Sequence, residues 1–251
     1  MHYNLCFDTR HFEFRRHHLA IVTALAATIS LSCGFGSDAR PPVDDSGSVG
    51  RFTSVAIGSD GLPLISYMSS GSGILIGSGL KKPAEAKDVR TGQEGSSLKV
   101  AHCSDLECTS ATITTLDDNG DVGRDTAIAI GDDGLGIISY YDLGNEDLKV
   151  AHCSNVKCTT STLSTLDSNG RVGESTSIAI GTDGVPLISY LDVSNGHLKI
   201  AHCADIECTQ ASITAIDTAG TVGLYSSITI GQDGLGLLSY WDIAERDLKT
   251  A

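Results

Sequence analysis

The sequence predicts an all-β fold built from repeated antiparallel sheets, and three observations support this. The first is internal repetition: "LKVAHC" at 98–103 recurs at 148–153 and, as "LKIAHC", at 198–203, a period of 50 residues. The second is the presence of 28 glycines in 251 residues, which indicates many tight turns. The third is the alternation of apolar and small side chains in segments such as "SIAI" at 177–180.

One repeat unit divides into four short strands, here named a to d. Strand a covers 177–180 and strand b covers 186–191, with the hairpin-turn sequence Asp183-Gly184 between them. Strand c covers 198–203. Strand d is the Thr- and Ser-rich run after the second cysteine of the unit, and it suits a half-solvated edge because threonine fits a pleated surface without requiring burial. Each unit therefore predicts one four-stranded antiparallel sheet.

Four antiparallel strands in roughly 40–50 residues are typical of one β-propeller blade. A β-helical solenoid is the alternative, and it fits less well because its coils are usually about half this length. The pattern "SIAIGxDGxPLISYxDxxxxxLKxAHC" resembles the repeats of secreted bacterial β-propeller proteins of unassigned function, and the resemblance covers residues 43–251. It implies an all-β, β-propeller-like fold of about 3.5 to 4 blades. Because residue 251 falls inside strand c of the fourth unit, we expect a fragment of a larger ring or self-association through an open edge.

The predicted domains are a signal peptide at 1–32, a linker at 33–48 and a repeat domain at 49–251. Four units divide the repeat domain, and they cover residues 49–121, 122–171, 172–221 and 222–251. The first unit is longer than the others because an insertion near 72–95 extends its b–c loop. Loops carry recognition more often than strands do, so this insertion is a candidate for ligand contact.

The N-terminal segment predicts export. Arg15 and Arg16 precede residues 19–32, an uncharged run of 14 residues that is too short to span a membrane but typical of a signal-peptide core. The small residues before Cys33 resemble the lipobox of bacterial lipoproteins, although Ser30 stands where that family prefers leucine. The resemblance implies lipid attachment at Cys33. We therefore expect an exported protein, either a cell-envelope lipoprotein or a secreted one, whose only membrane contact is a lipid anchor.

Six cysteines form three C-x4-C units, one in each complete repeat. An exported chain is exposed to oxidising conditions, so we predict local disulfides that close each c–d turn: Cys103–Cys108, Cys153–Cys158 and Cys203–Cys208. Zinc binding with the preceding histidines is the alternative. It is disfavoured because adjacent strand residues such as His152 and Cys153 point to opposite faces. We expect His102, His152 and His202 to be buried or half-buried structural residues.

The formal net charge is −14, and so acidic a surface repels phosphate backbones, which argues against nucleic-acid binding. In an up-and-down blade the d–a and b–c loops emerge at one end, which we call the loop face. Several carboxylates are predicted there: Asp142, Asp147, Asp192, Asp242 and Asp247. Such a cluster could bind Ca²⁺ or another ligand, but no D-x-D-x-D-G loop is present, and no other metal or cofactor is indicated.

The sequence does not show a catalytic centre. A sialidase-like glycosidase resembles this protein in its predicted propeller scaffold, and that family uses an arginine cluster, a tyrosine nucleophile and acidic partners. Here only Arg51 and Arg124 occupy equivalent positions, the Asp-box is absent, and four tyrosines repeat with the blade, which favours a packing role: Tyr67, Tyr140, Tyr190 and Tyr240. We therefore predict a non-catalytic recognition or scaffold protein that binds a protein or glycan through its loop face. The alternative is a sialidase-like glycoside hydrolase.

Overall fold

The computed structural model describes residues 40–70 and 95–251, and they form four antiparallel sheets. The first blade contains β1 (Ser48–Ile57), β2 (Pro63–Ser70), β3 (Ser97–Cys103) and β4 (Ala111–Asp117). The second contains β5 (Arg124–Ile130), β6 (Gly136–Asp142), β7 (Asp147–Cys153) and β8 (Ser161–Asp167). The third contains β9 (Val172–Ile180), β10 (Pro186–Asp192), β11 (His197–Cys203) and β12 (Ala211–Asp217). The fourth contains β13 (Val222–Ile230), β14 (Gly236–Asp242) and β15 (Asp247–Thr250).

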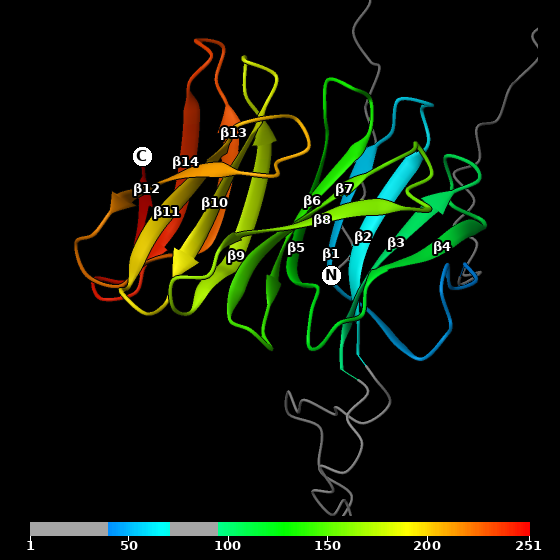
Figure 1. The fold of residues 1–251 in the computed structure, drawn as a ribbon, viewed down its shortest axis with the longest axis horizontal. Helices are drawn as coiled ribbons and strands as arrows, with labels where there is room; N and C mark the ends of the chain where they lie inside the picture. The colour runs from blue at the N-terminus through cyan, green and yellow to red at the C-terminus, as the bar shows by residue number, and fades with distance from the viewer. Residues whose placement is uncertain (1–39, 71–94) are drawn as a thin grey trace, which may run out of the picture. The chain divides into compact units, whose positions relative to one another are not determined.

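The predicted all-β, blade-like architecture is confirmed. Each strand pairs with its neighbour in sequence, so every sheet has the order a-b-c-d except the fourth, which has three strands (Figure 1). Strand a of the third blade begins at Val172 rather than at residue 177, because a register shift lets the chain continue pairing with β10. The predicted signal peptide, Cys33 and most of the insertion near 72–95 lie outside the described residues. Within the described part of the chain, no helix is long and apolar enough to cross a bilayer.

Successive blades bury a common core between them. Each of three apolar clusters draws its members from two neighbouring sheets, and the innermost strands β1, β5, β9 and β13 contact one another in that order. Between the second and third blades, for example, Ile137 and Leu148 pack with Ile178 and Ile188. A single sheet of this length could not bury both faces alone, so packing between sheets supplies most of the hydrophobic stabilisation.

Glycine is required where the backbones of two blades meet. Gly123 has φ +88°, and a Cβ at that position would lie 2.8 Å from the Cα of Leu98. Gly173 and Gly223 repeat this approach against Leu148 and Leu198, with φ of +103° and +105°. The "VG" sequence before each strand a therefore encodes both a left-handed backbone and the space for the preceding blade.

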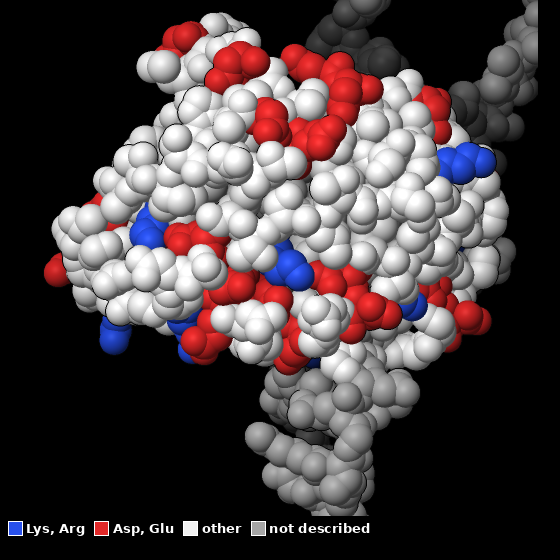
Figure 2. Space-filling view, viewed as in Figure 1, with Lys and Arg blue, Asp and Glu red and all other residues white. Residues whose placement is uncertain are grey.

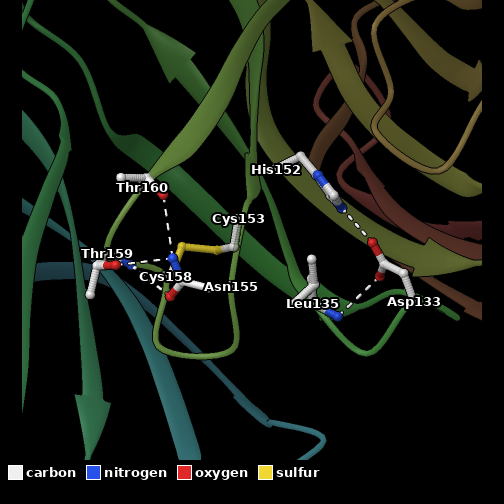
Figure 3. The surroundings of a disulfide bond; sticks show 8 residues. All are labelled: Asp133, Leu135, His152, Cys153, Asn155, Cys158, Thr159 and Thr160. Atoms are coloured by element: carbon white, nitrogen blue, oxygen red, sulfur yellow. Dashed lines mark hydrogen bonds and ion pairs between the residues drawn. A yellow bond between two sulfur atoms is a disulfide. The ribbon is translucent and has the colours of Figure 1, made fainter.

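The predicted disulfides are confirmed. The Cα atoms of Cys103–Cys108, Cys153–Cys158 and Cys203–Cys208 are 4.9, 4.8 and 5.0 Å apart, and each bond closes a c–d turn (Figure 3). Three such bonds indicate an oxidising, extracytoplasmic environment.

The repeat histidines hold the neighbouring a–b turn rather than a metal. Figure 3 shows His152 directed at Asp133, and its Nε2 lies 2.9 Å from Oδ2 of that residue. His102 and His152 are buried as expected, but the prediction for His202 is wrong, because its side chain is 47% exposed. The outer strand of the next blade contributes to the cover over His102 and His152, and the described fourth blade has no strand d to do the same for His202.

A buried polar cluster ties each blade to the segment before it. In the second blade, the Tyr140 hydroxyl donates to Asp117 Oδ2 at 2.7 Å, and Lys149 Nζ donates to the same oxygen at 2.5 Å. Lys149 also lies 3.7 Å from Asp142. We call this group the clasp. It recurs in the other blades as Asp44/Tyr67/Lys99, Asp167/Tyr190/Lys199 and Asp217/Tyr240/Lys249.

Candidate ligand-binding site on the loop face

A comparison of the four repeats within this chain locates a site. Residues of the core and the clasp are nearly the same in every unit, but three neighbouring positions change completely. Two of them are consecutive on strand a, and we call them the bulge positions: Arg51-Phe52, Arg124-Asp125, Glu174-Ser175 and Leu224-Tyr225. The third is their neighbour on strand b: Met68, Tyr141, Leu191 and Trp241. All lie at the end of strand a nearest the d–a loop, and therefore on the loop face.

The backbone is the same at all four sites although the side chains differ. The second bulge residue of each blade has a left-handed φ, namely 51° at Phe52, 51° at Asp125, 55° at Ser175 and 55° at Tyr225. This conformation is uncommon outside glycine, and the pairing of strands a and b shifts register beside it in every blade. A constant, strained backbone that presents variable side chains is typical of a functional position on a fixed scaffold.

The bulge aims its side chains at the next blade. Asp125 Oδ2 accepts a hydrogen bond from the backbone N–H of Ser175 at 2.8 Å. The Phe52 ring lies between two guanidinium groups, since the Cζ atoms of Arg51 and Arg124 are each 5.6 Å from its centroid. The innermost strands of the first three blades thus bring these five residues together.

Arginines concentrate at this site in an otherwise acidic protein. Figure 2 shows acidic side chains in several patches on one face, with few and separate basic ones. Three of the five arginines in the described ranges belong to the site: Arg51, Arg124 and Arg171. The Arg171 guanidinium pairs with Glu174 Oε1 at 2.5 Å, and this hydrogen bond and charge raise the Arg171 pKa. The buried Nε atoms of Arg124 and Arg171 have no hydrogen-bond partner within residues 40–70 and 95–251.

Tyr141 and Asp125 are the titratable groups most affected by burial here. Tyr141 is fully buried, and its hydroxyl has no hydrogen-bond partner among the described residues. Burial raises the pKa of Tyr141, which the nearby Arg171 guanidinium offsets only in part. Burial also raises the Asp125 pKa, and the Ser175 hydrogen bond and Arg124 do not compensate. Unpartnered buried donors together with a destabilised carboxylate indicate a place prepared for a ligand rather than for packing.

The loop carboxylates predicted as a cation or ligand site occupy other positions. Asp142, Asp192 and Asp242 are buried at the end of strand b, where each accepts a hydrogen bond from the N–H of its own b–c turn. Each also lies within 4 Å of the clasp lysine. Asp147 and Asp247 lie opposite Asp142 and Asp242 in register. No group of three or more potential metal ligands occurs in the described part of the chain, so this arrangement gives the calcium hypothesis no support.

Comparisons with known proteins agree on the architecture. No protein-family model matches the sequence, and no curated protein matches it. Among solved structures, a protein of unknown function from Dyadobacter fermentans superposes with a TM-score of 0.54 at 15% identity, over 75% of this chain and 56% of the other. An α-L-arabinofuranosidase from Fusarium graminearum gives a TM-score of 0.51 at 12% identity, over 84% of this chain and 63% of the other. The chain therefore spans about three-fifths of the length of these proteins.

The likeness shows a β-propeller-like fold and nothing more. At such low identity neither protein transfers an activity to this chain. Sequence reasoning had considered Arg51 and Arg124 only as an incomplete arginine cluster, and it did not single out Phe52, Asp125, Tyr141 or Arg171. The available signal was the contrast between constant and variable positions across the four repeats, which requires the units to be aligned position by position.

Proposed function

We propose that this protein is an exported recognition protein that binds a carboxylate-bearing glycan on its loop face, at the bulge positions of the first three blades. The observation that carries the proposal is the convergence of Arg51, Arg124 and Arg171 around Phe52 and Tyr141, at positions that the repeat leaves free to vary. Planar guanidinium groups suit bidentate binding of a carboxylate. The Phe52 ring adds an apolar surface of the kind on which a sugar ring can lie.

Binding to acidic and neutral glycans tests the proposal. Oligosaccharides that contain uronic or sialic acids, and their neutral counterparts, would be titrated into the full-length protein by calorimetry. We expect only the acidic members to bind, and Arg124→Ala to weaken binding by roughly 10- to 100-fold, the loss expected when a charged hydrogen bond is removed. Lys157→Ala is the matched control, since Lys157 is an exposed cation on the c–d turn at the opposite end of the blade. Equal binding of neutral and acidic glycans, or wild-type affinity in Arg124→Ala, would contradict it.

Hydrolysis of an acidic glycoside is the second candidate function. Asp125 has a raised pKa, Glu174 lies close enough to contribute to it, and the Tyr141 hydroxyl is near Arg171. A sialidase-like reaction needs an arginine cluster, a tyrosine nucleophile and acidic partners, and these residue types are all present. The complete burial of Tyr141 weighs against nucleophilic attack, so binding remains the first proposal.

A pair of tyrosine variants separates the two functions. If the protein is a hydrolase, it will release the chromophore from an aryl sialoside, and Tyr141→Phe will abolish turnover while acidic-glycan binding persists. Tyr225→Phe is the control, because Tyr225 is exposed on the fourth blade. A wild-type protein that binds acidic glycans but leaves every aryl glycoside intact excludes this second candidate and keeps the first.

Lipid anchoring at Cys33 completes the proposed setting. The three disulfides and the predicted signal peptide support export, and the lipobox-like sequence supports attachment to the cell envelope. Labelled palmitate should be incorporated into the wild-type protein and not into Cys33→Ser. If Cys33→Ser is processed and released as the wild type is, the protein is secreted without an anchor.

A further inference from the structure

The first blade exposes an apolar surface that every other blade buries. We call the side of a sheet that meets the preceding blade its leading face. On this face Ile128, Ile178 and Ile228 are 8%, 9% and 7% exposed, whereas Val55 at the equivalent position of the first blade is 62% exposed. Ile57, two residues further along β1, is 59% exposed. The first blade thus presents a leading face with no blade of the described chain against it.

The fourth blade exposes the opposite surface. The trailing face of a sheet is the side that meets the following blade, and Leu64 and Ile137 are buried on it at 1% and 0% exposure. Their equivalent in the fourth blade, Leu237, is 53% exposed. Leu248 is 81% exposed, whereas its equivalents on the trailing faces of the first three blades are fully buried: Leu98, Leu148 and Leu198.

The two exposed faces contain the two halves of the same backbone contact. Leu98, Leu148 and Leu198 each fill the space over the glycine of the next blade, at Gly123, Gly173 and Gly223. Gly50 is the equivalent glycine of the first blade, and an added Cβ there would meet no described atom within 4 Å. Leu248 therefore has no glycine to cover, and Gly50 has no leucine to cover it.

The bulge positions show the same complementarity. Phe52 of the first blade meets Arg124 of the second, and Tyr225 is the equivalent aromatic residue of the fourth blade. Tyr225 is 74% exposed and stacks only on Trp241 of its own sheet, with 6.1 Å between the ring centroids. Repetition of the contact would place Tyr225 over the residue equivalent to Arg124 in a following blade, and in this chain that residue is Arg51.

We propose that a second copy of this chain docks head to tail, with the trailing face of the fourth blade of one copy against the leading face of the first blade of the other. The contact repeats the interface that the chain forms three times internally, with Leu248 over Gly50, Leu237 near Val55 and Ile57, and Tyr225 over Arg51. Because the two faces differ, the contact is heterologous, and it closes when each copy offers its free trailing face to the other. This inference is independent of the glycan proposal.

Mixing two variants tests the head-to-tail arrangement directly. Val55→Asp places a charge on the leading face only, and Leu237→Asp places one on the trailing face only. By sedimentation velocity, we expect the wild type to form a species larger than the monomer, and each variant alone to be monomeric at the same concentration. An equimolar mixture should form a 1:1 heterodimer, because one variant retains the trailing face and the other retains the leading face. Leu106→Asp is the control, since Leu106 is 69% exposed on a c–d turn away from both faces.

Several outcomes would overturn the proposal. A monomeric wild type at 100 µM (a concentration on the order of the weakest specific interfaces) would mean that another occupant, such as a further part of this chain, covers the faces. A dimer that survives either single charge, or a mixture that stays monomeric, would mean that the copies associate elsewhere or face to face. The substituted side chains are exposed, so melting temperatures should be unchanged. Ile57→Asp and Leu248→Asp form a second pair if either first variant melts early.

Discussion

The clasp and the bulge positions lie a few residues apart on the same strands, and they have opposite histories within the repeat. The clasp keeps Asp, Tyr and Lys in all four blades, with Tyr–Asp hydrogen bonds of 2.6 to 2.8 Å. The bulge keeps only its backbone, and its side chains range from Arg124 and Asp125 to Leu224 and Tyr225. In the clasp every buried polar group has a partner, whereas the bulge cluster contains buried donors without one.

The difference separates residues that hold the blades from residues that the fold can do without. A buried lysine is tolerated only when its charge is compensated, so the clasp cannot change one member without the others. The bulge makes no such demand, and it tolerates an arginine, a glutamate or a leucine at one position. Stability therefore resides in the constant network, and we expect specificity to reside in the variable one.

The largest expected effect is the loss of one clasp aspartate. Asp117→Ala leaves Lys149 and the Tyr140 hydroxyl without their shared acceptor, and the Lys149 side chain is only 13% exposed. We expect a loss of about 3 kcal/mol in the free energy of unfolding, measured with urea. Asp217→Ala is the matched control in the fourth blade, where the lysine is 34% exposed, and it should cost about 1 kcal/mol or less. Equal losses at both sites would show that burial does not set the strength of the clasp.

Removal of one disulfide should have the next largest effect. Each bond closes a loop with a sequence separation of five, for which chain entropy predicts about 2 kcal/mol. Cys153→Ala combined with Cys158→Ala should therefore lower the melting temperature moderately and speed amide exchange in the c–d turn at 153–160. The equivalent pair at Cys103 and Cys108 should behave alike, because the turn is repeated. General loss of the fold in either variant would refute this local role.

Acid should weaken the clasp before it affects other contacts. Burial acts to raise the Asp117 pKa, but hydrogen bonds from Lys149 and Tyr140 outweigh it and hold that pKa below its usual range. Burial likewise opposes the shift at Asp44, where hydrogen bonds from Ser46 and Tyr67 lower the pKa to about 2. A depressed pKa stabilises the fold above the unfolded-state value of about 4 and is lost as pH falls through the folded value. The melting temperature should thus be level above pH 5 and fall towards pH 2, and Asp117→Asn should flatten that fall.

Most of the fold could be predicted from sequence because the repeat states it three times. The period, the Asp183-Gly184 hairpin and the cysteine spacing are local signals, and each corresponded to a strand, a turn or a disulfide. The site was less accessible. Asp142 and Asp147 were expected among solvated loop acids, but local turn hydrogen bonds and Lys149 draw Asp142 into the interior, which composition does not reveal.

The bulge could not be predicted for a different physical reason. No glycine marks the left-handed conformation at Phe52 or Asp125, so nothing local distinguishes these residues from ordinary strand positions. The exposure of His202 was also missed, since the cover over the equivalent histidines comes from the outer part of the following blade. Interactions between blades, rather than within them, account for both failures.

The smallest expected effect has the opposite sign and distinguishes the two regions most sharply. Burial raises the Asp125 pKa, so ionisation of this carboxyl opposes folding at neutral pH. Asp125→Asn removes the charge and keeps an oxygen to accept the Ser175 hydrogen bond, and asparagine tolerates the φ of 51° at this position. Its free energy of unfolding at pH 7 to 8 should rise by roughly 0.5 to 1 kcal/mol, as is usual when a functional site gives up a strained group. Below about pH 4 the carboxyl is protonated in both states, so the variant and the wild type should unfold alike. Urea unfolding at pH 8 and pH 3.5 checks both halves, with Asp117→Asn as the comparison because it should lose stability at pH 8. If Asp125→Asn also loses stability at pH 8, Asp125 belongs to the scaffold, and the division between a constant clasp and a variable bulge fails at that residue.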